Sequence, residues 1–340
     1  MSFSVFDIFN TIKEKFDEYE IGFTSEDLPG GGKQLGVNYR GGNFKIRIMN
    51  NKIDGASVDW SLVKNQTVTD ELQRALEGSL DKAVLKSSVY RSDDPTINII
   101  GSDESGKGDL FGGVVVAAAW IHPEKCDTLR NDDELNIKDS KELEDIECVK
   151  TFTKLINGET HVEKSIGDGY TSYHISPADN RFQVVVVVTT PMDYNRGLCA
   201  HKTPERLLES LHLLAIGDLV QLLHERKCTD VDDLVAVIDQ FIPSLDKEKQ
   251  LCTTVYDQAK EFGFKEFSIE LRPQAEQHVL ACALASIFAR VYFLNQVTMM
   301  GNDLGFELPL GSGKGPRKIY EKHFEGLEDQ ELAKFMKLQY

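Results

Sequence analysis

The chain has 340 residues, of which 41% are hydrophobic and 27% charged, a balance that is typical of globular proteins and excludes a fibrous or disordered one. This length supports one large domain or two ordinary ones. No run of 18 apolar residues predicts a membrane span. The N-terminus lacks the basic start and cleavage site of a signal peptide, and the six scattered cysteines form no CxxC pair. We therefore expect a cytoplasmic protein with reduced, buried cysteines.

The net charge of −17 is unevenly distributed along the chain. Residues 1–92 carry 12 Lys and Arg against 13 Asp and Glu, whereas the remainder carries 26 against 42. Proteins that bind nucleic acid are usually basic where they touch phosphate. Net charge, however, governs solubility and steering rather than what one cleft can bind. The acidity therefore counts against a nucleic-acid partner without excluding one.

The first 92 residues predict a small α/β domain. Apolar residues at helical spacing predict one helix over Phe3–Tyr19 and another over Val68–Leu85. Between them, a Gly-rich turn at Pro29–Gly32 precedes segments that alternate as strands do: Leu35–Tyr39, Phe44–Met49 and Ala56–Val58. The polar segment Tyr90–Thr96 contains a proline and predicts a linker. We therefore expect two domains, residues 1–92 and 93–340.

The remainder of the chain predicts strands that are followed by helices. Apolar runs predict strands at Ile97–Gly101, Gly113–Trp120, Val184–Thr190, Leu234–Ile238 and Phe267–Leu271. One long helix is predicted over Pro204–Glu225, with a proline in its first turn. Another is predicted over Ala275–Val297, with small residues on one face: Ala281, Ala283, Ala285 and Ser286. This order indicates an α/β sheet flanked by helices.

The segment Gly101–Asp109 (GSDESGKGD) allows two interpretations. Its glycines and Lys107 resemble the start of a phosphate-binding P-loop, which would favour a nucleotidase. However, Gly108 stands where a P-loop has its Ser or Thr, and a strand follows where a P-loop needs a helix. A metal site fits the segment better. Asp103 and Glu104 come at the end of a buried strand, where two repelling carboxylates favour a cation such as Mg²⁺ or Mn²⁺.

Two further acids adjoin buried segments. Asp239 ends an apolar strand (LVAVIDQF), where a charge is costly unless it is paired or binds something. Glu276 opens the helix AEQHVLACALASIFAR, whose small residues allow it to pack closely over the strand ends. Each acid also has a simpler interpretation, Asp239 as a helix cap and Glu276 as a complement to the helix dipole.

Four motifs together resemble a known family. GSDESGKGDLFGG, KDSKEL (Lys138–Leu143), VIDQF (Val237–Phe241) and AEQHVLACALASIFAR occur in the order typical of type 2 ribonucleases H. The resemblance is greatest to the ribonuclease HIII branch, because the fourth acid is Glu276, the turn reads Gly-Lys-Gly and residues 1–92 precede the similar part. Two features depart from the family pattern. Gly113 stands where Pro is more frequent, and ACALAS replaces AAAS.

This resemblance implies a ribonuclease H-like mixed sheet flanked by helices, preceded by a small TATA-binding-protein-like domain that binds substrate. It implies that the RNA strand of RNA/DNA hybrids is hydrolysed to 5′-phosphate and 3′-hydroxyl ends. Two Mg²⁺ or Mn²⁺ ions about 3.5–4 Å apart would be held by Asp103, Glu104, Asp239 and Glu276. The substrate contacts that it implies are Gly106, Lys107, Gly108, Ser140, Lys141, Ser286 and Arg290.

Several alternatives stay open at this level. Excision of single ribonucleotides from duplex DNA, as by ribonuclease HII, is one, and a non-catalytic nucleic-acid-binding module is another. Arg290 is equally compatible with a surface ion pair, and the basic residues of GSGKGPRK (Lys314, Arg317 and Lys318) with a solvated loop. Tyr194 and Asn195 match a YN pair of the family. We expect a monomer that does not associate with a membrane.

Overall fold

The computed structural model divides the chain into two compact units, Met1–Arg91 and Ser92–Tyr340, which are described separately. It describes residues 4–28, 32–51, 55–59, 66–76, 79–80, 98–130, 132, 135, 137, 140, 143–157, 160–228, 233–239, 266–272 and 275–338. The predicted linker Tyr90–Thr96 lies outside these residues, as does most of the predicted turn Pro29–Gly32.

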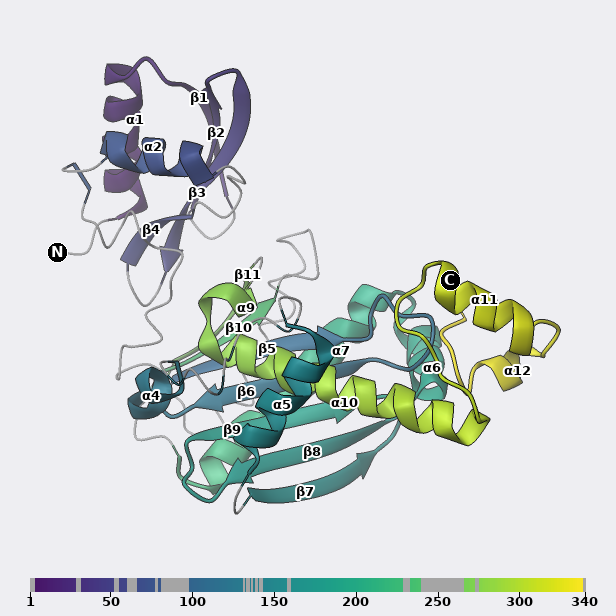
Figure 1. The fold of residues 1–340 in the computed structure, drawn as a ribbon. Coiled ribbons are helices and arrows are strands. Elements are labelled where there is room, and N and C mark those ends of the chain that lie inside the picture. The colour runs from purple at the N-terminus through teal and green to yellow at the C-terminus, as the bar shows by residue number, and fades with distance from the viewer. Residues whose placement is uncertain are drawn as a thin grey trace. The chain divides into compact units, whose positions relative to one another are not determined.

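The N-terminal unit is a four-stranded antiparallel sheet with two helices, α1 (Val5–Glu18) and α2 (Gln66–Leu76). The strands follow in chain order: β1 (Gly22–Asp27), β2 (Lys33–Tyr39), β3 (Gly42–Asn51) and β4 (Gly55–Asp59). Figure 1 shows both helices beside this sheet. They contribute to one buried cluster, which includes Ile8, Ile12, Phe16, Leu35, Val37, Ile46, Ile48 and Leu72. The polar strand β1 (GFTSED) was not predicted, and the second helix ends at Leu76, before the expected Leu85.

Polar side chains form a row across this small sheet. The register places Glu26, Gln34 and Arg47 side by side on β1, β2 and β3. Nε of Arg47 donates to Oε1 of Gln34 at 3.0 Å, and the Gln34 amide donates to Glu26. Because alternate residues of β2 and β3 belong to the buried cluster, this row lies on the face away from the helices.

The larger unit is built on a seven-stranded mixed sheet with the strand order β11-β10-β5-β6-β9-β8-β7. Its strands are β5 (Asn98–Ser105), β6 (Val115–Ile121), β7 (Thr160–Gly167), β8 (Tyr170–Pro177), β9 (Phe182–Val188), β10 (Asp233–Asp239) and β11 (Glu266–Arg272). β11, β10 and β5 are parallel, and the remaining neighbours are antiparallel. Thus β5 is a central strand between the parallel and antiparallel halves.

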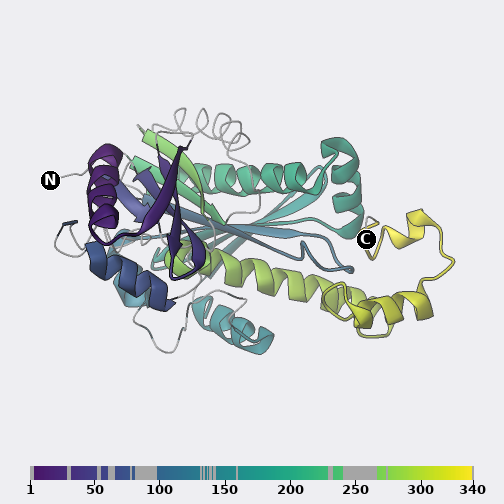
Figure 2. The same ribbon diagram turned by 90° about the horizontal axis from the view of Figure 1, so that it is seen from above.

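Two long helices cover this sheet. α7 (Pro204–Glu225) packs on β6 and β9, and α10 (Leu280–Leu304) packs on β5 and β6 from the opposite side (Figure 2). α5 (Asp145–Leu155) packs on α10, and α6 (Pro191–His201) precedes α7. The short elements are η1 (Pro123–Lys125), α4 (Cys126–Arg130), α9 (Ala275–His278), α11 (Lys314–His323) and α12 (Asp329–Leu332). α7 and α10 are long and apolar enough to cross a membrane, but 56% and 72% of their apolar windows lie buried, as in core helices.

The mixed sheet flanked by helices confirms the predicted fold class, and three local predictions need correction. The first predicted strand continues through Ser105, because Asp103 and Glu104 pair with Ala117 and Val116 of β6. The predicted helix Ala275–Val297 is divided at Val279, which has extended backbone angles (φ −114°, ψ 111°). Of the cysteines described, Cys199 is exposed rather than buried.

Candidate active site

Two acids lie in the central strand β5. Asp103 is only 1% exposed, and its Oδ1 accepts a hydrogen bond from the backbone N–H of Glu104 at 2.8 Å. The neighbouring strand β10 runs parallel to β5 with Ile238 opposite Ser102, so Asp239 follows beside Asp103. Two buried strands therefore bring these two carboxylates to one point of the sheet.

Side-chain alternation along β5 sends Asp103 and Glu104 to opposite faces. Ser102 faces α7, where its hydroxyl donates to the carbonyl of Ala117 and so accepts from Nδ1–H of His212; both distances are 2.8 Å. Nε2 of the same buried histidine lies 3.3 Å from Oε2 of Glu104, a contact that is an ion pair when the imidazole is protonated. Glu104 is thus held on the α7 face, whereas Asp103 lies on the α10 face.

Glu276 approaches from the helical side. It lies in the single turn of α9 and is 4% exposed. The backbone N–H of Ala275 donates to Oδ1 of Asp239 at 3.2 Å, which fixes the start of α9 at the end of β10. Asp239 therefore does cap a helix, as its simpler interpretation proposed, and through this contact it also brings Glu276 near the strand ends.

The buried thiol of Cys282, at the start of α10, lies within electrostatic range of three of the acids. Its Sγ lies 3.4 Å from the carbonyl oxygen of Val237. Burial raises the pKa of this thiol well above 9.0, and the negative charges of Asp103, Asp239 and Glu276 raise it further. These three acids come from β5, β10 and α9, so two strands and a short helix place carboxylates near one buried thiol.

The four candidate ligands fit a hard divalent cation in their chemistry, because all of them are carboxylates. In the part of the chain that the structure describes, no three His, Cys, Asp or Glu side chains converge closely enough to hold one ion. Glu104 contacts His212 on the other face of β5 and so lies apart from Asp103. The acids therefore fit a metal site in their chemistry and in the elements that carry them.

Burial of Cys282 leads to a first prediction. Iodoacetamide at pH 8 should alkylate the exposed Cys199 of the native protein and leave Cys282 unmodified, because only an accessible thiolate reacts. Mass spectrometry of tryptic peptides measures both, and labelling in denaturant supplies the fully reactive control. Rapid native labelling of Cys282 would contradict the close packing of α10 against β5.

The predicted substrate loop follows β5 directly. Gly106 is buried with φ +89°, and a Cβ atom there would lie 2.4 Å from the Phe293 ring, so the turn requires glycine. Gly108 is exposed. Nζ of Lys107 lies 3.7 Å from Oε1 of Glu104, and its side chain is 42% exposed. The loop thus presents a backbone turn and an ammonium group beside the acids.

The other predicted substrate residues divide into two groups. Ser140 and Ser286 are brought together, with their hydroxyl oxygens 2.6 Å apart, so the KDSKEL segment meets α10. Lys141 lies outside the described residues. Nε of Arg290 donates to Oδ1 of Asp145 at 2.8 Å, the ion pair that its alternative interpretation proposed.

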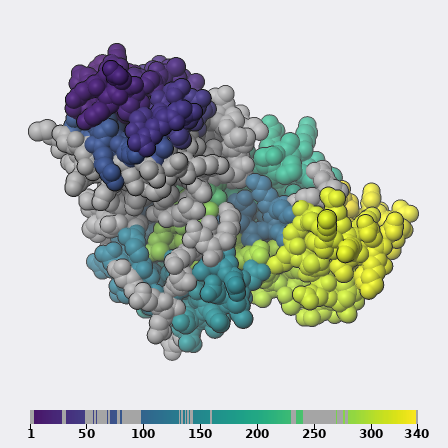
Figure 3. Space-filling model, turned by 45° about the horizontal axis from the view of Figure 1, so that its top comes forward, coloured from purple at the N-terminus to yellow at the C-terminus, as the bar shows by residue number. Residues whose placement is uncertain are grey.

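The basic residues of GSGKGPRK are exposed on α11: Lys314, Arg317 and Lys318. The turn before α11 is attached to the substrate loop, since Gly311 N–H donates to Oδ1 of Asp109 at 2.5 Å and Leu110 N–H donates to the Gly311 carbonyl at 2.9 Å. α11 and α12 form one surface at an end of the larger unit (Figure 3). A second basic feature therefore adjoins the loop.

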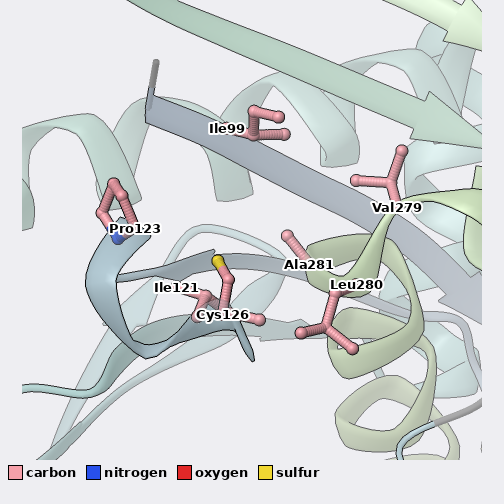
Figure 4. A pocket seen from close by; sticks show the side chains of 7 residues that line it. All are labelled: Ile99, Ile121, Pro123, Cys126, Val279, Leu280 and Ala281. Atoms are coloured by element: carbon pink, nitrogen blue, oxygen red, sulfur yellow. The ribbon is translucent and has the colours of Figure 1, made fainter. Parts of the chain in front are cut away.

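An apolar pocket lies elsewhere in the larger unit. Its lining carries no carboxylate and consists of Ile99, Ile121, Pro123, Cys126, Val279, Leu280 and Ala281 (Figure 4). The acids are therefore the better candidate site. Sequence reasoning missed His212, whose only signal was a single polar ring in an apolar helix face (LHLLAIG).

Comparisons with known proteins show the family and the fold of the chain. The family model for ribonuclease HII matches residues 100–340. Ribonuclease HIII of Streptococcus pyogenes serotype M5 (strain Manfredo) is 30% identical over 261 residues, covering 76% of this chain and 72% of that protein. The crystal structure of Bst-RNase HIII in complex with Mn²⁺ has a TM-score of 0.57 at 21% identity, covering 97% of this chain and 93% of that one. At this identity the structural match supports the fold.

Proposed function

Because the chain belongs to the type 2 ribonuclease H family, with relatives on the ribonuclease HIII branch, and is a ribonuclease H enzyme, we propose that it cuts the RNA strand of RNA/DNA hybrids. The observation that carries this proposal is that Asp239 follows beside Asp103 in the parallel strands β10 and β5 and accepts a hydrogen bond from Ala275 N–H, next to Glu276. A central parallel pair of strands and the start of a helix supply these acids from three separate parts of the sequence.

Asp103, Glu104, Asp239 and Glu276 would hold the divalent cations, either Mg²⁺ or Mn²⁺, and two ions would act in the catalytic state. Bound at these residues, such ions would activate a water and stabilise the leaving oxygen. We propose that the products carry 5′-phosphate and 3′-hydroxyl ends. In our proposal Glu104 turns from His212 toward Asp103 when it binds an ion. The bond between His212 and Ser102 would keep the histidine ring in place beside the vacated position.

Substrate contacts are proposed around this centre. The backbone of Gly106 and Gly108 and the ammonium of Lys107 would meet the phosphodiester beside the cut, where the 2′-hydroxyl distinguishes RNA from DNA. Ser140, Lys141, Ser286 and Arg290 would contact the same duplex, Arg290 after exchanging its bond to Asp145. The polar face of the N-terminal sheet, with Gln34 and Arg47, would provide a further contact. We propose a cytoplasmic monomer.

Excision of single ribonucleotides is the second candidate, because the matching family model is that of ribonuclease HII. One experiment separates the two. End-labelled RNA/DNA hybrid and a DNA duplex with one ribonucleotide are each incubated with Mg²⁺, Mn²⁺ or chelator. We expect metal-dependent cutting of the hybrid and little cutting of the single-ribonucleotide duplex. The reverse preference would move the protein to ribonuclease HII-type excision, and no cutting of either substrate would refute the proposed activity.

A further inference from the structure

The C-terminal segment, residues 335–338, wraps around the turn that follows the substrate loop. Gly112 N–H donates to the carbonyl of Phe335 and Lys337 N–H donates to the carbonyl of Leu110, both at 3.1 Å, and Phe111 and Met336 form an isolated antiparallel bridge. More than 220 residues of sequence separate the two segments, as the Asp109–Lys337 separation of 228 shows. The turn at 109–112 is therefore shaped by the last residues of the chain.

The side chain of Lys337 completes this contact from inside the protein. It is 1% exposed, and its Nζ donates to the carbonyls of Asp109 at 2.7 Å and Gly112 at 3.0 Å. The Nζ also lies 5.5 Å from the centre of the Tyr194 ring, within range of a cation–π contact. One ammonium group thus bridges both ends of the four-residue turn.

Asn195 holds the same segment from its other side. Its amide nitrogen donates to the carbonyl of Met336 at 2.9 Å, and its amide oxygen accepts from the N–H of Leu338 at 3.0 Å. These two bonds flank Lys337 in the sequence and fix the backbone that carries it. The Tyr194–Asn195 pair, for which the sequence suggested no role, therefore grips the C-terminal segment.

Burying the charged ammonium of Lys337 carries a desolvation cost that opposes folding. Burial lowers the pKa of Lys337 to about 8, against the opposing effect of the Asp109 carboxylate. Since the unfolded chain keeps the ordinary pKa of 10.5, the buried charge disfavours folding at neutral pH, and this effect fades only as pH rises above about 8. A group that works against folding, yet satisfies two loop carbonyls, indicates a positional role.

We propose that Lys337 is a positioning residue for substrate binding, which together with Asn195 holds the turn 109–112 and thereby sets the conformation of Gly106–Gly108. This proposal rests on the proposed function, in which that loop meets the hybrid. Neither residue touches the substrate in our account, so losing either one weakens binding of the hybrid and leaves the acids in place.

The test compares Lys337→Met, which removes both donated hydrogen bonds, with Lys337→Gln, which keeps an uncharged donor. Fluorescence anisotropy measures binding of a labelled hybrid in chelator, so the readout is independent of metal. Lys337→Met is expected to weaken binding about tenfold, because hydrogen bonds from a charged group are among the strong ones and loop position is sensitive to their loss. Lys337→Gln should recover part of the affinity.

Two further readouts separate positioning from a general loss of structure. With metal present, Lys337→Met should raise KM while kcat stays within about twofold, because the acids are intact. Hydrogen–deuterium exchange should rise over residues 106–113 and stay unchanged in β6, β9 and α7. The matched control is Lys334→Met, which removes an exposed ammonium just before this segment that pairs with the nearby Glu331. It should bind the hybrid as the wild type does.

Wild-type affinity of Lys337→Met for the hybrid would overturn the inference, as would exchange that rises throughout the larger unit. If Lys337→Met does not fold, Asn195→Leu tests the same contact from the other side and should weaken binding in the same direction. Failure of the wild-type protein to bind or cut the hybrid would instead refute the proposed function. In that case the exchange of residues 106–113 still decides whether Lys337 positions the loop.

Discussion

Replacing Asp103 with Asn should lower the single-turnover rate of hybrid cleavage about a thousandfold or more. Asp103 is the most deeply placed of the four acids and lies beside Asp239 in the central parallel strand pair. Asn keeps the shape of the side chain and can still accept from Glu104 N–H, but it removes the negative charge that a divalent cation requires. Loss of roughly 4 kcal/mol of transition-state stabilisation corresponds to this factor.

Binding of the hybrid in chelator should change little in the same variant, because the loop that meets the substrate is unaltered. Asp168→Asn is the matched control for charge. Asp168 is fully exposed, and its Oδ1 lies 3.9 Å from Nη1 of Arg196, at the limit of an ion pair. It should cleave at the wild-type rate. Full activity of Asp103→Asn would show that this carboxylate is not a metal ligand and would remove the basis of the proposed site.

The elements that carry the acids could be predicted because their sequences are locally distinctive. LVAVID ends an apolar run with a charge, and its strand β10 lies within one residue of the expected bounds at both ends. Pro204–Glu225 forms a helix over the predicted range, because Thr203 caps it and Pro204 stands in its first turn. The four acids were selected by motif and spacing, and their role as ligands remains a prediction.

Other features depend on partners far away in the sequence. β5 continues through Asp103 and Glu104 only because β6 pairs with them. Since successive side chains of a strand point to opposite faces of the sheet, the two acids lie on opposite faces. β7 was missed because it is an exposed, polar edge strand (THVEKSIG) that pairs only with β8. Lys337 resembles any terminal lysine in the sequence, and its burial follows from contacts with Asp109 and Gly112. Local sequence patterns do not predict contacts between residues that lie this far apart in the sequence.

Gly101 links the packing of the larger unit to the position of its acids. A Cβ atom at this residue would lie 2.1 Å from the backbone nitrogen of Cys282 and 2.3 Å from the carbonyl carbon of Ala281. Both are backbone atoms of α10, so no side-chain rotation can relieve the clash. The glycine thus allows α10 to approach β5 two residues before Asp103, and the small residues predicted on one helix face serve this close approach.

Gly101→Ala should therefore destabilise the larger unit by roughly 3 kcal/mol, the upper end of what overpacking of a filled core costs. For a unit of this size the melting temperature should fall by about 6–12 °C. The helix must move away from the strand, which shifts Glu276 and Cys282 relative to Asp103, so cleavage should also fall about a hundredfold even below the melting temperature. Calorimetry and single-turnover cleavage at 20 °C, about the temperature at which folded domains are most stable, measure the two effects.

The control is Gly315→Ala in the same unit, where the added Cβ would meet Cβ of Pro309 at an ordinary contact distance of 3.9 Å. That variant should keep or slightly raise its melting temperature, since Gly315 lies in α11 and alanine favours a helix. If Gly101→Ala instead has the melting temperature of the wild type, α10 does not approach β5 as closely as the 2.1 Å distance between the added Cβ and the Cys282 nitrogen implies. If it is destabilised but cuts at the wild-type rate, the position of α10 does not govern the acids, and Glu276 would have to reach them by another route.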